Sequence, residues 1–306
     1  MATRHTYASA DDLREYLSGT SYSSGWTSDG AALRLILEAE SRRIDDFCGG
    51  GTFGPLTESR YYDIGRGNLR HSSQPSVYGT PTGEIGNTQQ LVNSIPLDGW
   101  LISTSAVTAY GQTARTDNTS LSEGYGGDYW LLPYNSNPKT IFQMNEDTSN
   151  SLSAGQKTLL IAGQWGYSSD TISVTTADAI SSTTATSVSV TSGTDLSPAQ
   201  TILIDSEQMY ITAISGNTLT LERGVNGTSG ATHSGGATVY RYDYEPLIAQ
   251  ACKDLAKIVF RDRDLGRVDS IGGEGVDITR SSREAVQTLS TLNAYRVAAT
   301  SNGIVF

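Results

Sequence analysis

The chain has 306 residues, of which 32 are glycine, and a formal net charge of −11. This length allows about two domains and a sizeable core, and the low charged fraction of 17% favours β structure and long loops over a helical bundle. The negative charge argues against sequence-independent binding of nucleic acid, which requires Lys and Arg to displace counterions. It does not exclude DNA passing close by, because a negative wall lets DNA slide without sticking.

The cysteines and the N-terminus bear on the compartment. Cys48 and Cys252 both lie on or beside apolar helical faces, so we expect buried free thiols and neither a disulfide framework nor a metal site. Two cysteines in a chain of this length suit a reducing compartment such as bacterial cytoplasm. Residues 1–12 contain no apolar h-region, so we expect no secretory signal, and no apolar run approaches the roughly 20 residues that span a membrane.

Two helices are predicted near the N-terminus. Ser9 and Asp12 form a capping box that begins a short helix, and Gly19 ends it. The apolar residues in 31–48 have the spacing of a longer amphipathic helix, and this helix is expected to end at the glycines 49–51. The apolar side chains that recur along this helix at three- and four-residue steps, and that we expect in the core, are Leu33, Ile36, Leu37, Ile44 and Phe47.

The helical period disappears after about residue 57, and short runs typical of strands replace it. Up to residue 170 these runs lie at 101–110, 129–134, 139–144 and 157–163. Residues 66–90 are polar and rich in Gly, Pro and Ser, which predicts a long loop or an exposed arm.

Residues 172–241 are rich in Ser and Thr and predict a small β-domain. Its strand-like runs lie at 187–190, 201–205, 209–214 and 218–222. Ser215, Gly216 and Asn217 are typical of a hairpin turn between the last two runs.

Two more helices are predicted near the C-terminus. Pro246 lies in the first turn of one, and Gly266 ends it. Its apolar face consists of Ile248, Ala251, Cys252, Leu255, Ile258 and Val259. After a glycine-rich loop, Val276–Thr279 is expected to be extended, and a capping box of Ser281 and Glu284 to begin the last helix. The inward side chains of that helix are Ala285, Leu289, Leu292 and Tyr295.

The sequence offers few candidates for catalysis or cofactor binding. Gly49-x-Gly51-x-x-Gly54 fits the dinucleotide fingerprint, but it follows a predicted helix and does not lie between a strand and a helix. The three histidines, which lie in separate polar loops without the spacing of metal ligands, are His5, His71 and His233. No Walker sequence, nucleophile elbow or Cys/His constellation occurs.

Asp205 and Glu207 are the closest approach to a carboxylate site. They lie two residues apart on a predicted strand, so both would face the same side and could act as a catalytic pair or begin a Ca²⁺ site. Further acidic residues that would complete the roughly six oxygens of a Ca²⁺ site are missing, so we expect exposed strand carboxylates. The sequence therefore predicts no catalytic residue, no cofactor and no metal, and hence no enzyme.

Several short motifs occur in a fixed order along the chain. The first motif is the end of the helix predicted at 31–48, Phe47-Cys48-Gly49, and it is followed by Glu58-x-Arg60-Tyr61-Tyr62-Asp63. Later come Asp128-Tyr129-Trp130-Leu131-Leu132-Pro133-Tyr134-Asn135, then Gly163-Gln164-Trp165-Gly166-Tyr167, and finally Leu292-Asn293-Ala294-Tyr295-Arg296. In this order the chain resembles the phage head–tail connector (adaptor) family over roughly residues 31–62, 91–167 and 244–298, with one insertion before the Pro246 helix.

The resemblance implies a virion structural protein of the neck, assembled in the host cytoplasm. Its subunits would form a homo-oligomeric ring of twelve, bound to the portal protein above and to a stopper or tail protein below. Genomic DNA would pass through the ring without specific binding, and no membrane would be involved. Trp165 and Tyr167 would be structural, packing an aromatic lid on the core. The inserted segment also resembles a small β module of phage virion proteins, so we expect its flanks, Thr171 and Tyr242, to lie close together.

The last residues carry the portal contact that the resemblance implies. No charged side chain follows Arg296, and the segment is apolar at residues 304–306. The predicted portal-binding residues are Ser301, Asn302, Gly303, Ile304, Val305 and Phe306.

The expected fold class is α+β, with a small helical core built from N- and C-terminal helices, a β-rich region and an inserted β-domain. The expected segments are 1–56 with 243–306 for the helical core and tail, 57–171 for the β-rich region, and 172–242 for the insert. The predicted core-packing residues are Leu33, Ile36, Leu37, Ile44, Phe47, Trp165, Tyr167, Ile248, Leu255, Leu292 and Tyr295. The alternative is a β-rich receptor- or glycan-binding tail fibre or decoration protein, which the Gly/Ser/Thr-rich β portion and the 16 tyrosines favour and the terminal helices disfavour.

Overall fold

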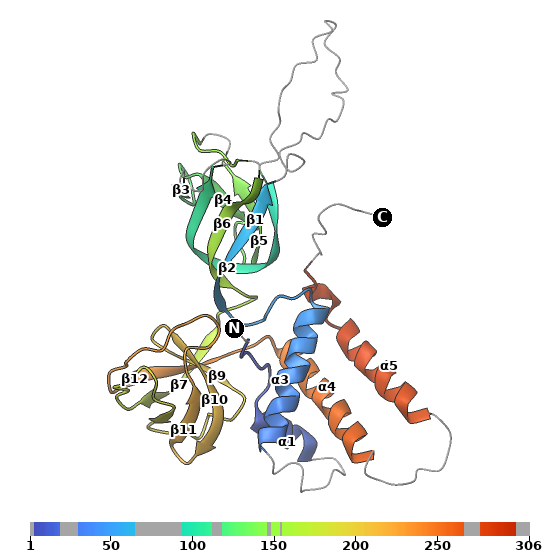
Figure 1. The fold of residues 1–306 in the computed structure, drawn as a ribbon. Coiled ribbons are helices and arrows are strands. Elements are labelled where there is room, and N and C mark those ends of the chain that lie inside the picture. Colours follow the sequence, from blue (N-terminus) through green and yellow to red (C-terminus); the bar gives the residue numbers. More distant parts are fainter. Residues whose placement is uncertain are drawn as a thin grey trace, which may run out of the picture. The chain divides into compact units, whose positions relative to one another are not determined.

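The protein is an α+β structure, which confirms the predicted fold class. The computed structural model describes residues 3–18, 30–64, 94–111, 118–145, 148–153, 155–265 and 276–297, without the side chains of 263–265 and 276–282. Within these residues there are four α-helices and two antiparallel sheets (Figure 1). The described residues form two compact units, which lie within residues 3–56 and 166–297 and within residues 57–165. The predicted three-part division of the chain stays a prediction.

The first two helices begin and end where local sequence signals place them. Helix α1 spans Ala10–Ser18, and its capping box is reciprocal: the Asp12 N–H donates to Ser9 Oγ over 3.1 Å, and the Ser9 N–H donates to the Asp12 carboxylate over 3.0 Å. Helix α3 spans Gly30–Phe47. After it, Gly49 and Gly50 have φ values of +101° and +80°, and their N–H groups donate to Asp46 O and Asp45 O. This is the Schellman ending, which needs left-handed backbone that glycine adopts freely.

The C-terminal helices are α4, Pro246–Leu265, and α5, Val276–Ser290, followed by the 3₁₀ turn η1, Asn293–Tyr295. The prediction that Val276–Thr279 is extended was wrong, and so was the prediction that Ser281 and Glu284 cap the start of the last helix. No Gly or Pro interrupts the sequence from 276 to 290, so the helix extends upstream of the serine and places the capping-box pattern inside it.

The helices pack as an antiparallel layer in which α3 lies on α4 and α4 on α5, with α1 beside α3 and α4. Cys252 Sγ lies 3.5 Å from Ser41 Oγ and 4.0 Å from Leu37 O, at the centre of the α3–α4 contact. Both cysteines are buried free thiols, as predicted, and burial raises the pKa of each to about 12. The predicted core residues that are fully buried in this unit are Leu33, Leu37, Ile44, Ile248, Leu255 and Leu292. Ile36, Phe47, Tyr167 and Tyr295 are only partly buried.

A six-stranded sheet in the order β7-β12-β9-β10-β11-β8 completes the first unit. Its strands are β7 Thr171–Ala177, β8 Ser187–Ser189, β9 Thr201–Ile204, β10 Glu207–Ser215, β11 Thr218–Glu222 and β12 Ala237–Tyr242. A bridge between Ala177 and Val190 links the two outer strands, so the sheet closes into a small barrel around an apolar core that includes Ile202, Met209 and Leu219.

The barrel agrees in part with the sequence. The β10–β11 hairpin turns at Gly216 and Asn217, as predicted, with Gly216 at φ +59°. Thr171 and Tyr242 are register partners on β7 and β12, which confirms that the flanks of the insert lie together. Neither β7 nor β12 was predicted as a strand, although Ile172 and Val174 alternate with polar residues in the β7 sequence TISVTTA.

Residues 4–7 are hydrogen bonded both to the helices and to the barrel. The Tyr7 N–H donates to Ser41 Oγ of α3 over 3.1 Å, and Thr6 Oγ1 lies 3.1 Å from the Tyr210 hydroxyl of β10. The Tyr210 hydroxyl in turn donates to Glu38 over 2.8 Å. The barrel is therefore joined to the helices by buried polar contacts, and we call this polar contact region the seam.

The second unit is a six-stranded antiparallel sheet in the order β1-β6-β2-β5-β4, with β3 paired to β2. Its strands are β1 Leu56–Ile64, β2 Ser94–Tyr110, β3 Asn118–Leu121, β4 Tyr129–Leu132, β5 Lys139–Met144 and β6 Gly155–Trp165. Trp165 is buried in its core, with the Arg60 guanidinium 4.2 Å from the Trp165 ring and the Tyr62 ring stacked 6.4 Å away. The predicted loop at 66–90 lies outside the described residues.

We expect Leu255→Ala to lower the free energy of unfolding by about 2–5 kcal/mol, because the substitution leaves a cavity at a fully buried side chain of α4. Denaturant unfolding measures this loss. The matched control is Val286→Ala on α5, whose side chain is 65% exposed and should change the stability by less than about 0.5 kcal/mol. Equal effects of the two substitutions would mean that α4 is not buried in a helical core.

Candidate functional site

Three of the sequence motifs meet in one aromatic cluster of the first unit. The rings of Phe53, Tyr167 and Tyr295 are mutual neighbours, with centroid distances of 5.4 Å, 5.6 Å and 5.3 Å. Tyr7 contacts Phe53 edge-on at 5.4 Å and Tyr244 at 5.1 Å. Edge-to-face packing of this kind stabilises aromatic pairs beyond the area that they bury. We call these five rings the aromatic junction.

Glycine is required at two places where the backbones of these motifs touch. Gly166 has φ +155°, and a Cβ on it would lie 2.3 Å from Gly54 O. The backbone of the next residue, Tyr167, donates to Thr52 O over 2.9 Å. Any larger residue at 166 would therefore push the Trp-Gly-Tyr strand end away from the segment after α3.

The end of the last motif lies against the end of α3. The Val297 N–H donates to Cys48 O over 2.8 Å, and a Cβ on Gly49 would come within 3.2 Å of Val297 O. The Arg296 guanidinium lies 5.4 Å from the ring of Phe47, which is partly buried. The glycines after α3 thus end a helix and admit another chain segment. They do not form a phosphate loop, because Gly49 and Gly50 follow a helix C-terminus.

His5 lies beside this junction in an irregular segment, and the prediction of a polar loop did not include its full burial. Its Nε2 lies 3.0 Å from Pro55 O and its Nδ1 lies 2.8 Å from the Tyr244 hydroxyl. Burial lowers its pKa to about 3, against the opposing hydrogen bond to Pro55 O. A neutral imidazole that donates from Nε2 and accepts at Nδ1 fits both contacts. His71 lies outside the described residues.

Asp45 is the second buried titratable group beside the junction. The Tyr7 hydroxyl donates to Asp45 Oδ1, and Arg42 Nη1 lies 2.6 Å from Oδ2 as an ion pair. Burial nevertheless raises the pKa of Asp45 to about 7, because removal from water disfavours the carboxylate more than Arg42 and Tyr7 favour it.

We expect the stability of the protein to depend on the ionisation of Asp45. A raised carboxyl pKa adds stability at low pH that is lost as the pH rises from about 4 to about 7, by at most about 1.4 kcal/mol per pH unit. Asp45→Asn removes this term and leaves His5 and the other groups in place. The free energy of unfolding of the wild type minus that of Asp45→Asn should therefore fall across this pH range. A difference that is constant with pH would show that Asp45 titrates normally.

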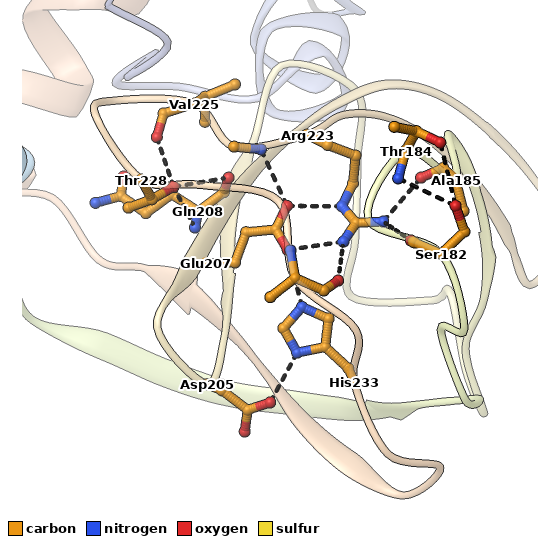
Figure 2. A network of polar contacts seen from close by, with 12 residues as sticks. Ser182, Thr184, Ala185, Asp205, Glu207, Gln208, Arg223, Val225, Thr228 and His233 are labelled. Atoms are coloured by element: carbon orange, nitrogen blue, oxygen red, sulfur yellow. Dashed lines mark hydrogen bonds and ion pairs between the residues drawn. The ribbon is translucent and has the colours of Figure 1, made fainter.

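Glu207, predicted to be exposed on a strand, is instead buried in a polar network inside the barrel (Figure 2). Its carboxylate accepts from Arg223 Nε and Nη2, each over 2.7 Å, and from the N–H groups of Gly224 and Ala231. His233 Nε2 lies 2.9 Å away. Burial acts to raise the pKa of Glu207, but the hydrogen bonds from Arg223, His233 and Ala231 outweigh it and lower the pKa.

The guanidinium of Arg223 is equally well satisfied. Besides Glu207 it donates from Nη1 to Ala185 O over 2.9 Å and to Ser182 O over 3.3 Å, and from Nη2 to Ala231 O over 2.6 Å (Figure 2). The network therefore holds the loop before β8 and the loop after β11 against β10. It can stabilise these loops, but Glu207 has no exposed side-chain surface at which to act on a substrate.

His233 closes the network from the segment between β11 and β12, and the prediction of a polar loop did not include its burial. Its side chain is buried between Glu207 and Asp205, whose Oδ2 lies 2.7 Å from His233 Nδ1. Asp205 is exposed and lies in the β9–β10 turn at φ +53°, so it does not share a strand face with Glu207 as predicted. Among the described residues no group of three His, Cys, Asp or Glu side chains could hold a metal ion.

We expect Arg223→Ala to lower the free energy of unfolding by about 3–5 kcal/mol, because it leaves the buried Glu207 carboxylate without its partner. Arg14→Ala is the matched control, since its ion pair with Asp11 is exposed and such pairs contribute about 0–1 kcal/mol. Thermal or denaturant unfolding of both variants tests this. A loss below about 1 kcal/mol for Arg223→Ala would mean that the network does not stabilise the barrel.

A groove of about 540 Å³ lies between α4 and α5 in the first unit. It is lined by Leu247, Gln250, Ala251, Asp254, Lys257, Ile258 and Arg261 of α4 and by Glu284, Gln287, Thr288 and Thr291. An ion pair between Arg261 and Glu284 spans it at 2.5 Å. Its mixed lining of aliphatic and polar side chains suits a protein surface better than a small cofactor.

The structure brings together some of the predicted residues and not others. Tyr167 and Tyr295 meet in the aromatic junction, while Trp165 belongs to the core of the second unit. The predicted portal-binding residues, Ser301–Phe306, lie outside the described residues. Within the described part of the chain, no helix is long and apolar enough to cross a membrane.

Comparisons of the chain with protein-family models, with curated proteins and with solved structures found no match. A functional proposal for this chain therefore rests on three observations: the order of the motifs, the aromatic junction and the barrel network.

Proposed function

We propose that the protein is a phage head–tail adaptor. Its subunits form a ring of twelve beneath the portal, join the DNA-filled head to the tail, and leave a channel through which the genome passes. The ring binds the portal above and a stopper or tail protein below, and its role is structural and not enzymatic. The protein would belong to the neck of the virion.

The observation that carries this proposal is the convergence of the motifs. The segment after α3, the Gly166-Tyr167 strand end and the Tyr295-Arg296 ending lie more than 100 residues apart in sequence, yet they form one junction. Glycines stand where their backbones approach most closely. Each of these motifs resembles the connector family separately, and in the structure their residues contact one another. Such agreement between sequence and contacts is expected of a shared fold.

Two further observations support a passive structural role. The net charge of −11 would let DNA slide past the ring, since few cations are available to replace its counterions. The best candidate for catalysis is Glu207, together with Arg223 and His233. The hydrogen bonds of these residues hold loops in place. A fixed network of this kind suits a scaffold.

The alternative is a receptor- or glycan-binding fibre or decoration protein. Exposed tyrosines of the second unit favour it: Tyr125 is 99% exposed between two glycines, and Tyr134 is 57% exposed. Exposed aromatic side chains are frequent at recognition surfaces. The bundle of four helices in the first unit gives a fibre no evident advantage, so we place this function second.

Negative-stain images of the purified protein, with and without its purified portal, separate the two functions. We expect rings, or portals capped by a second ring, and we expect a chain lacking Ser301–Phe306 to stay folded by circular dichroism but to leave portals uncapped. The intact portal alone is the control for ring dimensions. Rods or trimers that ignore the portal would overturn the adaptor proposal and support the fibre.

A further inference from the structure

Helix α3 carries an exposed ridge that no element in the described part of the first unit covers. Leu35 is 56% exposed, Ala39 is exposed one turn later, and Arg43 is exposed one turn after that. Residues four apart lie in one row along a helix, so these three side chains form a single ridge about 12 Å long. Leu35 lies about 200° around the helix from the buried Leu33, so the ridge points away from α4.

The groove between α4 and α5 faces a different direction. Cys252 marks the side of α4 that contacts α3, and Gln250 and Asp254, which line the groove, each lie two residues from it. Two residues correspond to about 200° around a helix, so the groove opens away from α3. A subunit therefore cannot fill its own groove with its own ridge.

We propose that the α3 ridge of one subunit packs into the α4–α5 groove of the next copy of the same chain. This inference rests on the proposed adaptor ring and names the contact that closes it. Two different surfaces of one chain that fit each other make a head-to-tail contact, and such contacts generate rings when the rotation closes.

The direction of the helices fixes how the two surfaces align. Within a subunit α3 and α4 are antiparallel. Asp45 lies with Tyr7, whose ring contacts that of Tyr244 just before α4 edge-to-face, whereas Ser41 lies at Cys252 further along α4. Neighbours in a ring of twelve differ by a rotation of about 30°, so α3 of one copy stays roughly antiparallel to α4 of the next.

The charges favour one antiparallel register. With Leu35 placed on Ile258, the equal rise of the two helices puts Ala39 level with Asp254. Helical side chains lean toward the N-terminus of their helix, so the Arg43 guanidinium extends to that same level. Arg43 of one copy would therefore meet Asp254 of the next, while Leu35 covers the aliphatic part of the groove. In this register an apolar side chain meets the aliphatic lining of the groove, and a cation now paired with Glu40 meets the Asp254 carboxylate, which also accepts from Tyr16 and Gln250 of its own subunit.

Cysteine cross-linking tests the contact, because both native cysteines are buried and do not interfere. We expect oxidised mixtures of Leu35→Cys and Ile258→Cys proteins to form covalent dimers, and neither protein alone to do so. The double variant should give a ladder of larger covalent oligomers. The control is a mixture of Val286→Cys, which lies on α5 outside the groove lining, with Ile258→Cys, and it should not cross-link. Cross-linking of Leu35→Cys alone would indicate a two-fold contact and overturn the proposal.

Substitution of the ridge gives a second readout. Leu35→Glu should weaken self-association about tenfold or more in sedimentation velocity, whereas Val286→Glu, which adds the same charge at a more exposed apolar side chain, should leave it unchanged. Circular dichroism checks that both variants are folded. Rings that form on portals without these cross-links, or that survive Leu35→Glu, would show that this contact is wrong while the adaptor function stands. The absence of rings on portals would count against the adaptor function itself.

Discussion

The seam between the helices and the barrel is polar, and this constrains the whole first unit. Buried donors and acceptors must find partners, since each unpaired group would cost about 1–3 kcal/mol. The segment of residues 4–7 supplies these partners: the Arg4 N–H donates to Asn226 Oδ1 over 2.7 Å, His5 bridges Pro55 O and Tyr244, and Thr6 reaches Tyr210. The helices and the barrel thus share one network, and a chain that lost this segment would leave both with unpaired groups.

The polar seam also restricts the ways in which the barrel can sit on the helices. An apolar contact tolerates sliding, but hydrogen bonds such as those of Gln208 to Pro55 O and Tyr210 to Glu38 require one geometry. In the proposed adaptor, this would keep the barrel at a constant position around the ring. The inserted segment is therefore fixed to the helical core by hydrogen bonds, although its two ends also pair directly with each other at Thr171 and Tyr242.

Local signals in the sequence were sufficient for the helices and for the strands with clear alternation. The capping box at Ser9 and Asp12 and the glycines after Phe47 act through bonds between near neighbours, so they can be read directly. The burial of Glu207 could not be predicted, because its partners Arg223 and His233 lie 16 and 26 residues away and only the fold brings them together. The strand β7 was missed although Ile172 and Val174 alternate in it, and its place in the sheet comes from pairing with β12, whose partner residues lie at least 60 positions away in the sequence.

The contacts of Asn226 have a consequence for the chemical ageing of the protein. An asparagine followed by glycine is the sequence most prone to lose its side-chain amide, because the small neighbour lets its backbone nitrogen attack the side-chain carbon, and asparagine is among the thermolabile residues. Asn226 precedes Gly227, but its side-chain amide accepts from the Arg4 N–H and donates to Gln208 over 2.8 Å, within the buried seam. These bonds must break before the attack can occur. The seam therefore also slows the loss of the Asn226 side-chain amide.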